Sequence, residues 1–353
     1  MSSIRSAFSQ NRAWIWTSLI LGLLICWLLD LVIGSVRIPV GDVTKILFGN
    51  PPSQPTWETI IRDFRLPKSI TAILAGSALA IAGMQMQTLF RNPLADPYIL
   101  GISSGASLGA ALVILLAGGG GVHFLANLGI LGDAGIILAA SAGALGVFSL
   151  VVLLARRVHT VTLLVIGVLV GYVVSAFVRI LIQFSMPENV QAYLSWTFGS
   201  FAGVTWQQLT IFAPVLMLAI SLSVFTIKPL NALLLGETYA RSLGIEPLKA
   251  RWLIILTASL MAGAVTAFCG LIGFIGIAVP HLCRSLLRSS DHRVILPACG
   301  IVGAMAALTA DVLAQAPGSA AILPLNSVTA LIGAPVVVFV ILKQRNLRKV
   351  FFS

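Results

Sequence analysis

Ten apolar runs of roughly spanning length follow one another along the chain, separated by short polar segments. Each run predicts a membrane-spanning helix, because crossing the hydrocarbon core takes about 20 mostly apolar residues. The runs cover residues 14–33, 67–89, 97–118, 134–155, 161–184, 207–227, 250–269, 271–287, 294–314 and 324–342. The eighth run is short and meets Pro280, His281 and Arg284, so it predicts a broken or tilted helix.

The segment 186–206 has a different pattern, in which polar and aromatic side chains are mixed. Glu188 and Gln191 represent the polar residues, and Tyr193 and Trp196 the aromatic ones. Amphipathic aromatic side chains prefer the boundary between lipid and water. We therefore predict that this segment forms a helix lying at the membrane interface.

The composition supports a membrane protein independently of the pattern. Hydrophobic residues make up 58% of the chain and charged residues only 9%, with a mean hydropathy of +1.02. Soluble domains carry about 25% charged residues. A chain so poor in charge cannot cover itself with a hydrated surface, so lipid must cover most of it, and an all-α fold is expected.

The distribution of basic residues predicts the orientation. The ten spans place 16 of the 22 Lys and Arg residues on the side of both termini and 5 on the opposite side, with Arg179 inside a span. Cytoplasmic loops are the ones enriched in Lys and Arg, so both termini are predicted to be cytoplasmic. The net charge of +11 follows mostly from this topology and requires no nucleic-acid partner.

Motifs for catalysis or metal binding are missing from the sequence. No Gly is directly followed by Lys, which excludes a phosphate-binding P-loop, and no His-Glu-x-x-His or Gly-x-Ser-x-Gly occurs. The four Cys lie in or beside apolar runs without Cys-x-x-Cys spacing, as packing residues do. His281 and His292 stand beside basic cytoplasmic residues and are expected to be solvated or capping. We expect no enzymatic activity, no cofactor and no metal.

An ion-coupled secondary transporter is the alternative from another class. Such proteins carry ionisable residues inside the helix bundle. The candidates here are Asp30, Arg179 and Asp311, of which Asp311 and Arg179 could form a pair within the membrane. Each lies in the outer third of its span, however, where snorkelling or a helix-end contact is the expected role.

Several polar motifs interrupt the apolar runs. They are residues 92–97 (NPLADP), 100–106 (LGISSGA), 270–276 (GLIGFIG), 279–281 (VPH), 291–293 (DHR), 310–311 (AD) and 323–335 (LPLNSVTALIGAP). Together with the small-residue block from Arg65 to Gly109, they resemble the FecCD family of ABC transporter permeases, importers of iron-siderophore, haem and cobalamin complexes. The resemblance extends over most of the chain. It implies a single transmembrane permease domain, residues 1–353.

A polar island at 228–249 separates two spans on the predicted cytoplasmic side. Pro229 can open a short helix there and Gly244 can close it, while Glu237 and Arg241 share one face in the favourable order. These residues alone would fit an ordinary amphipathic loop helix. The pattern Gly-Glu-x-x-Ala-Arg-x-Leu-Gly also resembles the segment that docks FecCD permeases onto their ATPase. The matching positions are Gly236, Glu237, Ala240, Arg241, Leu243 and Gly244.

On the outer side, the resemblance implies docking of a substrate-binding protein. Arg65 and Lys68 match positions that face acidic residues of that protein, although snorkelling at a helix start would also explain them. Gln315 stands where many relatives have Arg, and Ile322 where they often have Glu. This departure favours weaker docking there, or a second permease subunit that differs from this chain.

The resemblance also implies a substrate pathway at a dimer interface, lined by the spans 161–184 and 324–342. Thr160 and Val161 match the cytoplasmic gate region. The expected function is a permease subunit for a ferric siderophore complex, with haem or cobalamin as alternatives. The expected partners are ABC ATPase subunits, a periplasmic or lipid-anchored substrate-binding protein, an identical or different second permease subunit, and membrane lipid. The expected location is the bacterial plasma (inner) membrane, crossed in multiple passes.

Overall fold

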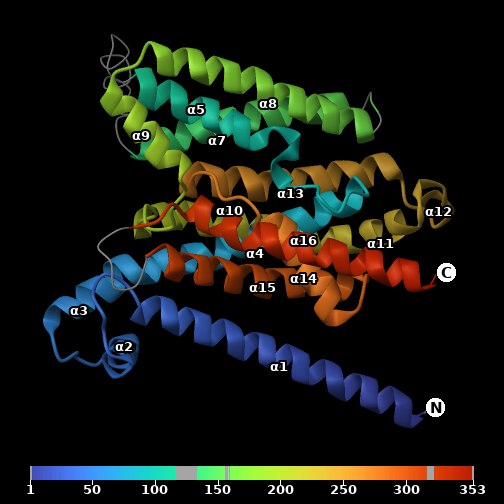
Figure 1. Cartoon of the computed structure of the whole chain (residues 1–353), viewed down its shortest axis with the longest axis horizontal. Coiled ribbons are helices and arrows are strands. Elements are labelled where there is room, and N and C mark those ends of the chain that lie inside the picture. The colour runs from blue at the N-terminus through green and yellow to red at the C-terminus, as the bar shows by residue number, and fades with distance from the viewer. Residues whose placement is uncertain (1, 117–132, 156–157, 159, 316–321, 352–353) are drawn as a thin grey trace.

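A computed structural model describes residues 2–116, 133–155, 158, 160–315 and 322–351. Every regular element in these ranges is a helix, which confirms the predicted all-α fold (Figure 1). In the described part, seven helical segments are long and apolar enough to cross a membrane, and three shorter apolar helices bring the number to ten. Each of the ten corresponds to one predicted run.

The long segments run through α1 (Ser2–Val32), α4 (Leu66–Leu89), α7 (Asp133–Ala155), α8 (Thr160–Gln183), α10 (Trp206–Ser223), α13 (Pro247–Cys269) and α15 (His292–Ala314). The three shorter apolar stretches belong to α5 (Ile102–Leu116), α14 (Ile275–Leu287) and α16 (Leu325–Phe351). At 13 residues, α14 is too short to cross about 30 Å of hydrocarbon unaided.

The remaining helices lie at the two ends of the bundle. At one end are α2 (Val40–Leu47), α3 (Pro55–Thr59) with the π-helical turn η1 (Ile60–Arg65), and α9 (Pro187–Thr197). At the other end are α11 (Ile227–Leu235), which follows the short turn η3 (Val224–Thr226), and α12 (Glu237–Ser242). The start of α1 and the end of α16 lie on the side of α12 (Figure 1). Both ends of the chain are thus on the side that the basic residues identify as cytoplasmic.

Two helix boundaries differ from the predicted ones. The span expected over 97–118 is interrupted: the 3-10 turn η2 (Pro97–Leu100) ends at Gly101, where φ is 77°, and α5 begins only after it. A left-handed backbone suits glycine and ends a helix. The interface helix expected over 186–206 stops at Thr197, and the chain does not return to a helix until Trp206.

The eighth span is broken, which is one of the two forms predicted, but the break lies before α14 and not at Pro280, which is inside the helix. Residues 270–273 are not helical, and α14 begins after Phe274, whose φ of 67° is left-handed. Non-helical backbone at membrane depth is tolerated where protein surrounds it. The break is enclosed in this way, because the backbone N–H of Gly273 donates to the side chain of Asn326 at 3.0 Å.

The helix α4 forms the centre of the bundle and packs against α10, α13, α14 and α15. Glycines allow two of these contacts to be very close. A Cβ at Gly76 would lie 2.2 Å from the carbonyl oxygen of Gly303, and one at Gly83 would lie 1.9 Å from that of Gly276. Small residues at helix crossings let backbones approach and gain van der Waals contact in a membrane.

Replacing Gly83 with Ala is therefore expected to lower the melting temperature of the protein in detergent. The atom that the new methyl group meets is backbone, so α4 and α14 must separate, at a cost of about 1–3 kcal/mol. Gly146→Ala in α7 is the control, because nothing lies within 4 Å of a Cβ there. That variant is expected to keep or slightly raise the melting temperature. An equal loss in both variants would contradict close packing as the cause.

Candidate functional site

The cytoplasmic island consists of two short helices joined at Gly236. The single helix expected to open at Pro229 does not form. Instead, α11 begins at Ile227 and ends before Gly236. The backbone of Gly236, with φ 117° and ψ 155°, interrupts the helix before α12 begins. Residues other than glycine rarely adopt this conformation, so glycine fixes the angle between the two helices. Gly244, with φ 75°, follows α12 as predicted for a helix end.

The surface of α12 combines one anchor with exposed apolar side chains. Ala240 is fully buried and holds the helix against the bundle. Leu235, Tyr239 and Leu243 are 66%, 47% and 57% exposed, and Arg241 is also exposed. We call Leu235, Tyr239, Arg241 and Leu243 the coupling patch. An exposed apolar cluster at the cytoplasmic end of the bundle indicates a surface that binds another protein.

The ion pair of Glu237 differs from the predicted one. Its carboxylate lies 3.2 Å from Nη2 of Arg251 at the start of α13, and Arg251 also donates to the carbonyl of Val158 at 3.3 Å. Arg241 shares the helix with Glu237 but forms no ion pair within the described residues. The pairing therefore fixes α12 to α13 and leaves the guanidinium of Arg241 available on the surface.

Further hydrogen bonds tie the two short helices to neighbouring hairpins. Arg91, in the hairpin after α4, donates to the carbonyl of Leu233 at 2.9 Å. Asn231 donates to Asp291 at 2.7 Å and accepts from the backbone N–H of His292 at 2.9 Å. The backbone N–H of Arg293 and the amide of Asn231 hold the pKa of Asp291 below its ordinary value, because both donate to its carboxylate. These contacts connect α11 and α12 to the ends of α4, α13 and α15.

Of the two roles expected for the histidines, solvated or capping, the first is wrong, because both side chains are buried. His292 is 2% exposed and lies between the hydroxyl of Thr88 at 2.9 Å and the side-chain oxygen of Asn231 at 2.7 Å. His281 is 3% exposed, with Nε2 2.7 Å from the carbonyl of Pro93. Both therefore join cytoplasmic hairpins to the bundle. The described residues contain no cluster of three His, Cys, Asp or Glu side chains that could hold a metal.

A polar network inside α4 was not predicted from the sequence. Gln85 is fully buried, and its amide donates to the hydroxyls of Thr226 and Thr257, each at 3.0 Å. Gln87 accepts a hydrogen bond from Arg284 at 2.6 Å. The signal in the sequence was a pair of Gln residues, two positions apart, within an otherwise apolar span. Buried amides of this kind need partners from neighbouring helices.

On the outer side, the structure brings Arg65, Lys68 and Gln315 together along one cavity of about 600 Å³. Arg65 and Lys68 are only 6% and 7% exposed, so neither snorkels to the surface. Arg65 donates to the carbonyls of Leu31 and Val32 at 2.6 and 3.0 Å, and also to that of Val36. It thereby satisfies backbone groups at the end of α1 that have no partner within the helix.

Lys68 forms the centre of a buried charge cluster. Its Nζ lies 2.5 Å from Oδ2 of Asp311 and 3.4 Å from Oδ1 of Asp30, and Gln315 donates to the same Asp311 oxygen at 2.7 Å. The suggested pair of Asp311 with Arg179 is therefore wrong. The predicted topology contained a signal for this cluster, because Asp30, Lys68 and Asp311 all stand at the outer ends of their spans. The cluster ties α1, α4 and α15 together.

Thr160 and Val161, the two residues expected at the gate, are the first two residues of α8. The side chains of Thr160 and Val161 lie outside the described part of the chain. Further along, α8 has a wide exposed apolar face that includes Leu169, Tyr172 and Phe177, at 56%, 70% and 57%. On a membrane-spanning helix, such a face contacts lipid or another subunit.

In the described part, ten apolar helices surround a buried polar centre, and the exposed cytoplasmic patch lies on short helices tied to two hairpins and to α13. These features define a multi-pass membrane protein with an exposed apolar surface at its cytoplasmic end. The model of the FecCD transport family matches residues 22–343, so the chain belongs to this family. It is 37% identical over 338 residues to the vitamin B12 import system permease protein BtuC of Klebsiella pneumoniae, covering 96% of each chain. The corresponding protein of Shigella boydii is 37% identical over 341 residues, with 96% and 97% covered.

Solved structures agree with this assignment. A chain of an inward-facing metal-chelate type ABC transporter superimposes with a TM-score of 0.82 at 30% identity, covering 94% of this chain and 99% of the other. A chain of PsaBC from Streptococcus pneumoniae shares the fold, with a TM-score of 0.51 at 17% identity, covering 80% of this chain and 93% of the other. The protein is accordingly an ABC importer permease subunit, a multi-pass protein of the bacterial plasma membrane.

Proposed function

We propose that this permease carries a ferric siderophore complex across the plasma membrane, driven by ATP hydrolysis in separate ATPase subunits. The coupling patch is the observation that supports an ATP-driven mechanism best. Its apolar side chains and the free guanidinium of Arg241 suit a partner protein that binds at the cytoplasmic face. Because α11 and α12 are held to two hairpins and to α13, closure of such a partner would move the spans as well.

Arg179 supports an anionic chelate as the substrate. It is exposed on α8, one turn before Gln183, and makes no ion pair within the described residues. Beside it lies a polar pocket of about 270 Å³ whose lining includes Ser103, Ser107 and Tyr193. An ionisable side chain within a span marks a functional site by default, and a guanidinium suits carboxylate or catecholate oxygens. Cobalamin is the second candidate, because it is the substrate in the names of relatives 37% identical to this chain.

The remaining parts of the mechanism follow from the family. A substrate-binding protein would dock on the outer side near Arg65, Lys68 and Gln315. A second permease subunit, identical or different, would pack against the exposed face of α8 and complete the pathway. Thr160 and Val161 would form the cytoplasmic gate of this single domain. Alternating access would then release the substrate to the cytoplasm.

Uptake into proteoliposomes tests the function. The full-length chain is reconstituted with its ATPase and binding protein, and uptake of three substrates is compared: an anionic ferric triscatecholate, a neutral ferric trishydroxamate and cyanocobalamin. We expect ATP-dependent uptake of the anionic ferric complex. Uptake that needs no ATP but stops when the ion gradients are collapsed would instead support an ion-coupled transporter. ATP-dependent uptake of cyanocobalamin alone would assign the second candidate.

Replacing Arg179 with Gln is expected to reduce uptake of the anionic ferric complex by roughly 10- to 100-fold. A hydrogen bond to a charged group contributes about 1.5–3 kcal/mol, and each 1.4 kcal/mol is a factor of ten. Uptake of a neutral substrate should change little. Arg62→Gln is the control, because Arg62 is also on the outer side and exposed but pairs with Glu58. Equal losses of uptake for charged and neutral substrates would contradict a role of Arg179 in recognising the charge of the substrate.

A further inference from the structure

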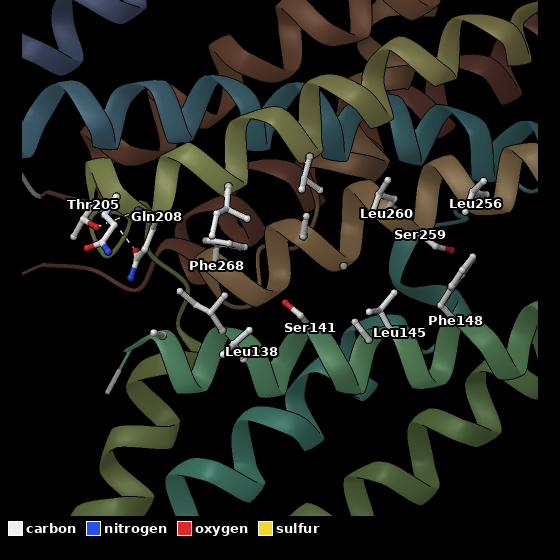
Figure 2. Close-up of a pocket in the computed structure, with 18 residues that line it drawn as sticks. Leu138, Ser141, Leu145, Phe148, Thr205, Gln208, Leu256, Ser259, Leu260 and Phe268 are labelled. Atoms are coloured by element: carbon white, nitrogen blue, oxygen red, sulfur yellow. Dashed lines mark hydrogen bonds between the residues drawn. The ribbon is translucent and has the colours of Figure 1, made fainter. Parts of the chain in front are cut away.

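A long apolar groove runs between α7, α10 and α13, away from every residue assigned above. Its volume is about 560 Å³. Figure 2 shows Leu138 and Leu145 of α7 on one side, with Leu260 and Phe268 of α13 on the other. Closely packed interiors contain few spaces of this size. A space of this size between three helices leaves room for an occupant.

The groove opens sideways into the hydrocarbon region of the bilayer. Leu138, Leu145 and Ile211 line it and are 62%, 56% and 62% exposed. All three belong to helices that cross the membrane. Their apolar side chains can face lipid at this depth, whereas water or a polar solute would be unfavourable there. The occupant should thus be hydrocarbon for most of its length.

The outer end of the groove is polar. Thr205, Gln207 and Gln208 line it there, and Figure 2 shows Thr205 and Gln208 at the end opposite Leu256. The side-chain oxygen of Gln208 accepts from the backbone N–H of Thr205 at 3.2 Å, which caps α10. The amide nitrogens of Gln207 and Gln208 donate to no described residue. These donors are available to phosphate or ester oxygens.

A tryptophan fixes the depth of that polar end. Trp206 is 44% exposed and donates from its indole nitrogen to the carbonyl of Arg62 at 2.8 Å. Tryptophan is enriched at the level of the lipid headgroups. Gln207 and Gln208, its neighbours in sequence, therefore lie at the outer boundary between headgroups and hydrocarbon.

The length of the groove matches one leaflet. Phe268 near its outer end and Leu256 at its inner end are 12 positions apart on α13. At a rise of 1.5 Å per residue this is about 18 Å. Half of a hydrocarbon core about 30 Å thick is about 15 Å. A single fatty acyl chain extended through one leaflet would reach along the whole groove.

We propose that the groove is a binding site for one phospholipid of the outer leaflet. One acyl chain lies between α7, α10 and α13, and the phosphate or ester oxygens accept hydrogen bonds from Gln207 and Gln208. The lipid completes the packing of three helices, two of which lead to the coupling patch. The helix α10 is followed by α11, and α13 carries Arg251, which pairs with Glu237 of α12. The site is independent of the transported substrate.

Native mass spectrometry of the full-length protein tests this proposal. Delipidated protein is titrated separately with a phosphatidylethanolamine carrying palmitoyl and oleoyl chains and with palmitic acid. We expect one phospholipid to bind at least tenfold more tightly than any further lipid, and more tightly than palmitic acid. Ala264→Trp, which fills the groove, should remove this tight binding. Leu153→Trp introduces the same side chain on the exposed face of α7 outside the groove and should not.

Two conservative variants identify which part of the lipid is recognised. Gln207→Leu, at an exposed position, should weaken phospholipid binding severalfold and leave palmitic acid unaffected. Ser259→Ala removes a buried hydroxyl without a partner from the groove wall, and should leave phospholipid binding equal or tighter. Equal binding by wild type and Ala264→Trp would overturn the site. If palmitic acid bound as tightly as phospholipid and Gln207→Leu had no effect, the assignment to a phospholipid would be wrong.

Discussion

Lys68→Met is expected to destabilise the outer end of the bundle by about 3–5 kcal/mol, the typical cost of removing one partner from a buried ionic cluster. The side chain that remains is apolar and of similar length, so the packing of α4 changes little. What changes is the charge. Asp30 and Asp311 would face each other without the ammonium group that separates them, and both are buried, at 0% and 7% exposure.

The measurement is the melting temperature of the purified permease alone, in detergent. Lys45→Met is the matched control, because Lys45 also pairs with an aspartate on the outer side but is 51% exposed. Exposed pairs contribute about 1 kcal/mol or less, so this variant should melt close to the wild type. A triple variant with Lys68→Met, Asp30→Asn and Asp311→Asn should recover much of the loss, because neutral replacements remove the unpaired charges together.

This experiment separates a structural role of Lys68 from a docking role. If Lys68 serves chiefly to bind a partner, Lys68→Met would keep the wild-type melting temperature and lose only affinity for the binding protein. If it holds α1, α4 and α15 together, the loss appears with no partner present. Similar melting temperatures for the Lys68 and Lys45 variants would contradict the second role. The burial of Lys68 and its distance of 2.5 Å from Asp311 favour it.

The sequence predicted the ten apolar segments and the all-α fold because lipid imposes a simple rule. A span must be apolar over a known length, whatever it packs against. The position of the break in the eighth span could not be predicted in this way, because the signal in the sequence was Pro280 and the polar residues that follow, and α14 continues through them. Helix boundaries that are set by backbone conformation were harder to predict from the sequence. The interruption at Gly101 and the early end of α9 at Thr197 depend on local turns that hydropathy does not record.

Partners across the bundle could not be predicted in the same way. Glu237 has an ideal partner four residues away in Arg241, yet pairs with Arg251 because α12 lies against α13. Asp311 was matched with Arg179 when only their presence within spans was considered, and instead binds Lys68. Which residue becomes the ion-pair partner depends on which helices are neighbours in the bundle. The motifs of the site could be located in the sequence, but the direction in which each side chain points could not.

The free guanidinium of Arg241 leads to the second prediction, that Arg241→Glu will reduce ATP-dependent uptake by at least tenfold. The side chain is exposed on a short helix whose backbone is held by Ala240 and by the pair of Glu237 with Arg251. The charge reversal therefore alters the surface without loosening α12. If the ATPase presents an acidic groove to this patch, placing like charges together costs several kcal/mol, and each 1.4 kcal/mol is a factor of ten.

Two readouts place the defect in coupling rather than in folding. The amount of ATPase that co-purifies with the permease should fall, whereas the melting temperature of the permease alone should not. Lys228→Glu is the matched control, because it reverses another exposed charge on α11 but lies outside the coupling patch. Equal losses in both variants would indicate a general effect of charge on the cytoplasmic face. Full ATP-dependent uptake with Arg241→Glu would contradict docking through this patch.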